Sequence, residues 1–284
     1  MLEKAVSFGP DGNLFGVISE PTGDNIKTNA PAVIILNAGL LHKVGPYRLN
    51  VDLARAIAGK GFFVIRFDLS GIGDSRSNPK NGTRWDMATK DVRQSMKLLS
   101  RRYGHNKFIL VGLCSGSDNA HRISLSDERV IGTVHLDGFS FKNLRYYLHY
   151  FGPRLLSFNT VKKKLVDMVK YILRKIFKSK INMQFTPLEL ASLNRDFPTK
   201  KQAQEDFKLL VTRGVKLLYV YNGMGQRYNS YKNQLRDSLK VDFLDFLDLE
   251  YYPFSLHTYD STHSRKLVIN RVSEWIYNNF SLKL

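Results

Sequence analysis

The residues with the clearest chemical potential lie in the segment Lys107–Ala120, KFILVGLCSGSDNA. Its apolar residues 108–111 have the pattern of a short buried strand. The strand runs into Gly112-Leu113-Cys114-Ser115-Gly116, in which glycine stands two positions before and two positions after a cysteine. A strand followed by a Gly-x-nucleophile-x-Gly turn and a helix holds the central side chain in a strained conformation, pointing away from the sheet. The chemistry expected of such a thiol is attack on an acyl carbonyl.

Cys114 is a better candidate nucleophile than Ser115. Residues two before and two after the nucleophile crowd its side chain, so both must be small. Around Ser115 these positions hold Leu113 and Ser117, and Leu113 would clash. A helix beginning at Ser117 or Asp118 would also favour the thiolate through its N-terminal dipole. The alternative is an ordinary buried cysteine, which packs as a small hydrophobe; the flanking glycines and the preceding strand argue against it.

The rest of the chain alternates apolar strands with amphipathic helices. The patterns predict strands over 5–8, 14–19, 32–36, 62–67, 108–111, 130–136, 215–221 and 249–254. They predict helices over 49–59, 85–103, 231–238 and 266–280, with a helical, basic segment over 139–212. The turn residues 9–13 join the first two strands as a hairpin. This order predicts an α/β fold: a mostly parallel eight-stranded sheet with helices on both faces.

Composition narrows the classes of function. The chain has 284 residues and one cysteine, so no intrachain disulfide can form and the thiol is free. No apolar run is long enough for a spanning helix, and the N-terminus lacks a signal pattern. We therefore expect a cytoplasmic protein. The net charge is +18, and more than half of it lies in residues 142–181, which contain eleven Lys or Arg and one acidic residue, Asp167.

Several motifs together carry a family resemblance. The string Phe67–Ser75, FDLSGIGDS, resembles the D-x-x-G-x-G-x-S turn of the α/β-hydrolase superfamily, in its serine aminopeptidase-like and monoacylglycerol-lipase-like group. Residues 112–116 match the nucleophile elbow of that group, and Asn37-Ala38-Gly39 looks like its His-Gly oxyanion loop with Asn for His. The cysteine elbow and Leu136-Asp137-Gly138 are similar to hydrolases found beside bacterial exopolysaccharide and exosortase genes.

The resemblance implies a catalytic histidine between the last strand and the closing helix. His257 stands there and is our predicted base. His263, six residues later, is the competitor, but it can instead begin the closing helix.

The acid is harder to find. Its usual place in the family follows the strand that ends at Tyr221, and there the chain reads Asn222-Gly223-Met224-Gly225-Gln226, without a carboxylate. Some relatives place the acid one strand earlier, which selects Asp137. Its alternative role is that of a turn residue before Gly138. A thiol, with a pKa of about 8.5, also needs the acid less than a serine does.

Backbone groups complete the predicted site. The resemblance implies an oxyanion hole made by the N–H of Ser115 and one N–H from Gly39 or Leu40. Asp68 and Asp74 are carboxylates of a turn that holds loops in place, so we predict structural roles for them. No His/Cys cluster has metal-ligand spacing and no glycine-rich loop fits a phosphate cradle, so no metal or cofactor is predicted.

Residues 139–212 stand where such folds insert a helical cap, which predicts a core of 1–138 and 213–284 and a cap of 139–212. Residues 161–177 have apolar positions at helical spacing and seven nearby lysines and arginines. The simplest interpretation is a cap helix with a solvated basic face. The alternative partner is an anionic membrane surface or an anionic substrate. The lack of a binding motif argues against nucleic acid.

These observations predict a hydrolase that cleaves a carboxylic ester or thioester through an acyl-enzyme on Cys114, with a small acyl compound as substrate. Two alternatives stay open at this point. An acyltransferase would use the same site with an acceptor hydroxyl in place of water. A non-catalytic binding protein of the same fold would explain both the absent acid after Tyr221 and the Asn37 substitution.

Overall fold

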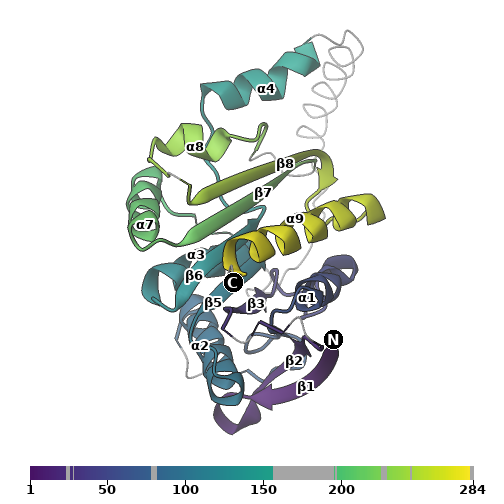
Figure 1. The fold of residues 1–284 in the computed structure, drawn as a ribbon. Helices are drawn as coiled ribbons and strands as arrows, with labels where there is room; N and C mark the ends of the chain where they lie inside the picture. The colour runs from purple at the N-terminus through teal and green to yellow at the C-terminus, as the bar shows by residue number, and fades with distance from the viewer. Residues whose placement is uncertain are drawn as a thin grey trace, which may run out of the picture.

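The computed structural model describes residues 1–23, 26–27, 29–77, 82–155, 195, 197–224, 229–243 and 245–281. Within these residues, eight strands form one sheet in the order β1-β2-β4-β3-β5-β6-β7-β8 (Figure 1). The strands are β1 (Leu2–Phe8), β2 (Leu14–Glu20), β3 (Ala32–Leu36), β4 (Val64–Phe67), β5 (Phe108–Leu113), β6 (Val130–Leu136), β7 (Lys216–Met224) and β8 (Leu247–Leu256). The helices are α1 (Leu49–Gly59), α2 (Arg84–Tyr103), α3 (Ser115–Ser126), α4 (Leu144–Leu155), α7 (Lys200–Thr212), α8 (Gln234–Leu239) and α9 (Thr262–Phe280), with short 3-10 turns at Pro10–Gly12 and Pro46–Arg48.

The sheet is parallel from β4 to β8, and only β1 and β2 run antiparallel to their neighbours. β1 and β2 form the predicted hairpin, with Phe8 opposite Leu14 at its turn. The predicted eight-stranded, mostly parallel sheet is confirmed. Because β5, β6, β7 and β8 are neighbours in this order, their carboxyl ends lie side by side at one edge.

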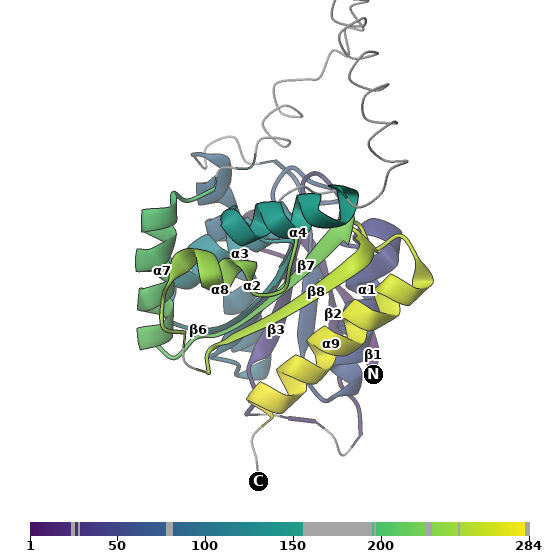
Figure 2. The same cartoon turned by 90° about the horizontal axis from the view of Figure 1, so that it is seen from above.

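Helices cover both faces of the sheet, as predicted (Figure 2). α1 and α9 pack on one face, where Leu53 and Trp275 share a core with the inward side chains of β3 and β5. α2 and α3 pack on the other face against β1 to β5, through residues such as Val92 and Ile123. α7 and α8 extend that second layer over β7 and β8, with Phe207 fully buried. The central strands β3 and β5 are apolar and buried throughout because both of their faces are covered.

Element ends differ from the sequence pattern where polar caps or edge positions decide them. α9 begins at Thr262 instead of residue 266, because the Ser261 side chain accepts the N–H of Ser264 and caps the helix. β7 and β8 extend beyond their predicted apolar runs, since the two strands pair with each other from Leu217 and Leu247 to Met224 and Leu256.

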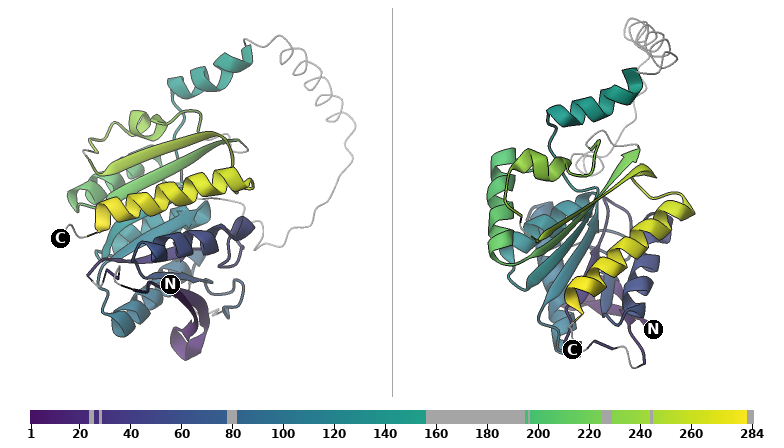
Figure 3. Two further views of the ribbon diagram at one scale, coloured as in Figure 1. Left: turned by 45° about the vertical axis from the view of Figure 1, so that its right-hand side comes forward. Right: turned by 45° about the horizontal axis from the view of Figure 1, so that its top comes forward.

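The segment 139–212 is described only in part. α4 stands apart from the sheet layers (Figures 1 and 3), and its start is held by bonds from Asn143 to Tyr231 and from Ser230 to the carbonyl of Tyr146. The helix predicted over 161–177 and most of the basic stretch 142–181 lie outside the described residues, so the cap and its membrane-facing surface stay predictions. None of the helices within the described ranges is long and apolar enough to cross a bilayer.

Candidate active site

The carboxyl ends of four neighbouring strands bring the predicted site residues together. Cys114 follows β5, Asp137 follows β6 and His257 follows β8. The backbone N–H of Cys114 donates to the carbonyl of Leu136, and that of Asp137 to the carbonyl of Val220, so each turn is tied to the next strand. The strand order, rather than proximity in sequence, therefore positions the three side chains.

Cys114 sits in the strained backbone conformation expected of a nucleophile turn, with φ 56° and ψ −119°. A positive φ is costly for a residue with a side chain and persists only where the surroundings impose it. Here α3 begins directly at Ser115, with Cys114 as its N-cap and no side-chain cap bond. The predicted helix start at Ser117 or Asp118 was therefore wrong, because the turn itself starts the helix through the N–H of Ser117 donating to the Cys114 carbonyl over 3.0 Å.

The two flanking glycines are required by backbone packing. A Cβ atom on Gly112 would lie 2.1 Å from the backbone carbon of Gly116, and one on Gly116 would lie 2.6 Å from the carbonyl oxygen of Asn37. Backbone contact is thus a further reason for glycine at these two positions, besides the predicted crowding of the thiol. They are small because α3 crosses the ends of β5 and β3 in contact.

His257 and Asp137 form a direct pair. The ring Nδ1 of His257 lies 2.7 Å from Oδ2 of Asp137, whose carboxylate is almost fully buried. The backbone N–H and the side-chain amide of Asn222 both donate to the same carboxylate, over 2.8 and 2.9 Å. The residue at the usual acid position in β7 is thus an asparagine that holds the Asp137 carboxylate in place.

The ring of His257 is poised to be positively charged. Burial opposes that charge, but the hydrogen bonds with Asp137 and Cys114 outweigh burial and raise the pKa of His257 to about 9. Because Asp137 takes Nδ1, Nε2 is the ring nitrogen left to face the sulfur. His263, the competing histidine, lies exposed in the first turn of α9.

The Cys114 thiol is correspondingly poised to be an anion. Burial acts to raise its pKa, yet the hydrogen bond with His257 and the positive charges of Arg195 and His257 lower it below the ordinary value. The two shifts favour a thiolate–imidazolium pair at neutral pH. Such a pair is the reactive form of a cysteine nucleophile with a histidine base.

The loop that carries Gly39 and Leu40 lies against the nucleophile turn. The N–H of Gly39 donates to the side-chain hydroxyl of Ser115 over 2.7 Å. One of the predicted oxyanion donors is thus engaged by Ser115 itself in this structure. Rotation of that hydroxyl would free the amide for a substrate oxygen.

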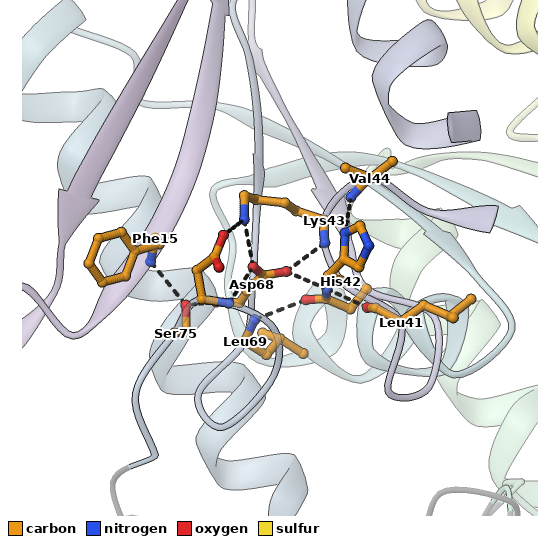
Figure 4. A network of polar contacts seen from close by, with 10 residues as sticks. Phe15, Leu41, His42, Lys43, Val44, Asp68, Leu69 and Ser75 are labelled. Carbon is orange, nitrogen blue, oxygen red and sulfur yellow. Dashed lines mark hydrogen bonds and ion pairs between the residues drawn. The ribbon is translucent and has the colours of Figure 1, made fainter. Parts of the chain in front are cut away.

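Asp68 lies at the centre of a network of polar contacts that anchors the same loop (Figure 4). Its buried carboxylate accepts the Nζ and backbone N–H of Lys43, the N–H of Asp74 and the amide of Asn37. The Nζ of Lys43 also pairs with the Asp74 side chain. The structure thus gives both aspartates the contacts of loop-holding residues.

Asn37 and Gly73 show why this motif has its composition. The side-chain oxygen of Asn37 accepts the N–H of Leu69, and its amide donates to the carbonyl of Leu41. A Cβ atom on Gly73 would lie 2.4 Å from the Asp68 carboxylate, and the φ of Gly73 is +52°. Glycine is therefore needed for both space and conformation. The motif fixes the position of the Gly39–Leu40 backbone relative to Cys114.

A cavity of about 290 Å³ opens beside this loop. Its wall includes Leu40, Leu69, Ile72, Met87 and Ala88, with Arg84 and Asn119 among the polar residues. The Arg84 guanidinium approaches the carbonyl of Gly39 at 3.5 Å, and its charge interacts with that of Cys114. The cavity therefore borders the predicted oxyanion loop and lies within electrostatic reach of Cys114.

Comparison with known proteins agrees with this architecture. The family model described as alpha/beta hydrolase fold matches residues 31–160. The protein has the α/β-hydrolase fold. The hydrolase-fold match spans Gly39, Cys114 and Asp137, but not His257. Its eight-stranded sheet is the fold that the sequence predicted.

Solved structures with the hydrolase fold resemble nearly the whole chain at low identity. The α/β hydrolase GrgF from Penicillium aligns with a TM-score of 0.62 and 13% identity, covering 99% of this chain and 100% of its own. An esterase from Pyrococcus furiosus aligns with a TM-score of 0.60 and 13% identity, over 99% and 92% of the two chains. A serine hydrolase without a lid from Xanthomonas campestris aligns with a TM-score of 0.57 and 12% identity, over 100% and 96%. No curated protein matches the sequence significantly. The narrower similarity to exopolysaccharide-associated hydrolases stays a prediction.

Two residues of the site were missed by sequence reasoning. Asn222 was seen only as the absence of an acid, although an amide directly after a buried strand is itself a polar signal. Arg195 could not be singled out from the sequence, because it belongs to no motif and is one of many basic residues in the segment 139–212. No metal-binding group of three His, Cys, Asp or Glu side chains occurs among the described residues.

Proposed function

We propose that the protein is a hydrolase that cleaves a carboxylic ester or thioester, with Cys114 as nucleophile. The observation that carries this proposal is a chain of two hydrogen bonds. The Cys114 thiol bonds with His257, and Nδ1 of His257 lies 2.7 Å from Oδ2 of Asp137. The Xanthomonas neighbour is a serine hydrolase and the Pyrococcus neighbour an esterase, which supports the reaction class. A cysteine in the elbow changes the nucleophile within that class.

The chemistry follows from the charges. The thiolate attacks the acyl carbonyl, and the backbone N–H groups of Ser115 and of Gly39 or Leu40 stabilise the resulting oxyanion. As the carbon–oxygen or carbon–sulfur bond breaks, His257 gives its Nε2 proton to the leaving alcohol or thiol. Water then attacks the thioester, and His257 takes the proton of that water. The second bond cleavage releases the carboxylic acid and restores the Cys114 thiolate.

The geometry of the site also helps to weigh the two alternative functions, a non-catalytic binding protein and an acyltransferase. A non-catalytic role loses its support from the sequence, since Asp137 supplies the acid that is absent after Tyr221 and Asn37 has a structural role in its loop. An acyltransferase would use the same thioester with an acceptor hydroxyl replacing water. We propose hydrolysis because the neighbours named above are hydrolases. We also propose a cytoplasmic location, which would keep the thiol reduced.

Intact-mass spectrometry after brief exposure to an activated ester tests this proposal. We expect one acyl adduct, on Cys114, which forms more slowly in His257→Ala and is lost in Cys114→Ala. A folded protein that forms no adduct would instead support the non-catalytic alternative. An adduct that persists in water and transfers to an added alcohol would support the acyltransferase.

We further propose that the cavity beside the oxyanion loop holds the acyl chain of the substrate. Ala88 lines the cavity from α2 and is almost fully buried, so Ala88→Leu should fill part of the space. Each methylene excluded from an apolar site forfeits about 0.8 kcal/mol, or roughly fourfold in kcat/KM. In a series of esters from acetate to octanoate, the variant should keep activity on acetate and lose it progressively on longer chains.

A matched control separates cavity filling from general overpacking. Ala203 is fully buried in α7 and lies away from the cavity. Ala203→Leu should lower the melting temperature without changing the ratio of acetate to octanoate activity. An unchanged ratio in folded Ala88→Leu as well would show that the acyl chain binds elsewhere.

A further inference from the structure

One arginine connects the nucleophile turn to the acid turn. Arg195 makes a bidentate ion pair with Asp118 in the first turn of α3, with both nitrogen–oxygen distances 2.7 Å. Its Nη1 also donates to the carbonyl of Asp137 over 3.0 Å, and its Nη2 to the carbonyl of Cys114 over 3.2 Å. The side chain is only 8% exposed. A single guanidinium thus binds three separate points of the site.

The two carbonyls that it binds belong to strained residues. Cys114 has φ 56° and Asp137 has φ 49°, and neither is a glycine. Such conformations persist only when the surrounding structure imposes them. A planar guanidinium with five N–H donors can bind a carboxylate and two carbonyls at once, whereas an ammonium group cannot match that geometry. The arginine therefore suits a clamp that holds both turns.

Arg195 also places a buried positive charge beside the nucleophile. Burial opposes its charge, but the bonds and charge of Asp118, together with Cys114 and Asp137, raise its pKa further. The cation is therefore permanent, and it favours the thiolate form of Cys114. Its contact with Asp118 fixes the cation at the N-terminal end of α3.

We propose that Arg195 is a positioning residue that clamps the Cys114 and Asp137 turns together and supplies a fixed positive charge beside the thiolate. The proposal rests on the function proposed above, for which the thiolate is the reactive group. Arg195 comes from the connection between β6 and β7, so this connection contributes directly to the reactivity of the elbow. The role differs from that of a catalytic residue, because the hydrogen bonds of the guanidinium go to Asp118 and to backbone carbonyls, and its effect on the thiolate is electrostatic.

The test is the pH dependence of Cys114 alkylation by iodoacetamide, which reads the thiolate directly. In Arg195→Met the cation is lost and the Asp118 carboxylate is left uncompensated, so both changes disfavour the thiolate. We expect the alkylation curve to shift upward by about one pH unit, which is a roughly tenfold loss in rate on the acidic limb of the curve, where the thiol is mostly protonated. In Arg195→Lys the positive charge is kept, so the upward shift should be smaller. In Asp118→Asn a negative charge near the thiolate is lost, so the curve should shift to lower pH.

Arg213 provides a matched control at the opposite end of α3. Its Nη1 donates to the carbonyl of Ser124 and its Nη2 to that of Asp127, over 2.6 and 3.1 Å. Arg213→Met also removes a guanidinium from helix-end carbonyls, but at the C-terminal end of α3, which is the end opposite Cys114. Its alkylation curve should match that of the wild type. Equal curves for folded Arg195→Met and Arg213→Met would overturn the proposal.

The charge role and the proposed function can fail separately. If Arg195→Met does not fold, Asp118→Asn tests the charge role instead. A shift of its alkylation curve to lower pH would support that role, and an unmoved curve would contradict it. If the wild type alkylates at low pH but hydrolyses no ester, the proposed function fails while the role of Arg195 in thiolate formation is still measured. In ester hydrolysis, kcat of Arg195→Met should fall about tenfold with KM nearly unchanged, because Arg195 does not line the cavity.

Discussion

Replacing Cys114 with alanine is expected to abolish ester hydrolysis while leaving the fold intact. The thiol is the atom that bonds to the acyl carbon, and removing a nucleophile from a triad lowers kcat by about 10⁴-fold or more. The fold should survive, because Cys114 is only partly buried and alanine faces the same backbone strain at φ 56°. Steady-state hydrolysis of a preferred ester, with circular dichroism and a melting curve, checks both parts.

Cys114→Ser is the matched variant for this prediction. Serine preserves the size of the side chain but has a far higher pKa, so the ion pair with His257 no longer forms in the resting state. We expect activity well below the wild type, with any remaining acyl adduct on residue 114. Undiminished hydrolysis by folded Cys114→Ala would rule out this nucleophile.

Asp137→Asn is expected to narrow the pH range of activity. Asp137 carries the charge that stabilises protonated His257, whose pKa is about 9. Without that charge the pKa of His257 falls, so the imidazolium loses its proton at lower pH. A less cationic His257 also stabilises the thiolate less, so the pKa of Cys114 rises. The reactive pair is therefore lost from both the alkaline and the acidic side.

The measurement is kcat/KM against pH for an alkyl ester, whose leaving group needs the His257 proton. The wild-type profile should fall above about pH 9, and the falling limb should move to lower pH in Asp137→Asn. The loss at the optimum should be smaller than the roughly 10⁴-fold seen for serine triads, because a thiol is more acidic. Asp68→Asn is the control: it loosens the oxyanion loop and should lower the rate without moving the limb. An unmoved limb in Asp137→Asn would contradict its role as partner of His257.

The sequence was sufficient for the sheet and for the residues at its strand ends. Apolar runs mark buried strands, and alternation with helices leaves few arrangements, so the order of Cys114, Asp137 and His257 could be anticipated. Glycine spacing favours Cys114 over Ser115 because the constraint is local, and in the structure Gly112 packs on the backbone of Gly116 and Gly116 on that of Asn37. Asp137 is predicted from the resemblance, because some relatives place the acid one strand earlier, and its carboxylate does lie against His257; its role as the acid belongs to the proposed function.

The remaining parts of the site depend on side chains that meet only after folding. Asn222 bonds to a residue 85 positions away, and Arg195 bonds to one 77 positions away. No local pattern predicts such pairs, since neither periodicity nor composition records which polar groups meet. The engagement of the Gly39 amide by Ser115 was missed for the same reason: it depends on a side-chain rotamer.

That Ser115–Gly39 hydrogen bond gives the site an internal competitor for its own donor. A neutral substrate carbonyl that displaces the Ser115 hydroxyl exchanges one ordinary hydrogen bond for another and gains little. The oxyanion that forms during attack is charged, and a hydrogen bond to a charged oxygen is about twice as strong. In the proposed mechanism, the benefit of the Gly39 amide would thus be withheld from the bound substrate and realised as the carbonyl becomes anionic. The resting hydroxyl thereby directs this donor toward a higher kcat instead of a lower KM.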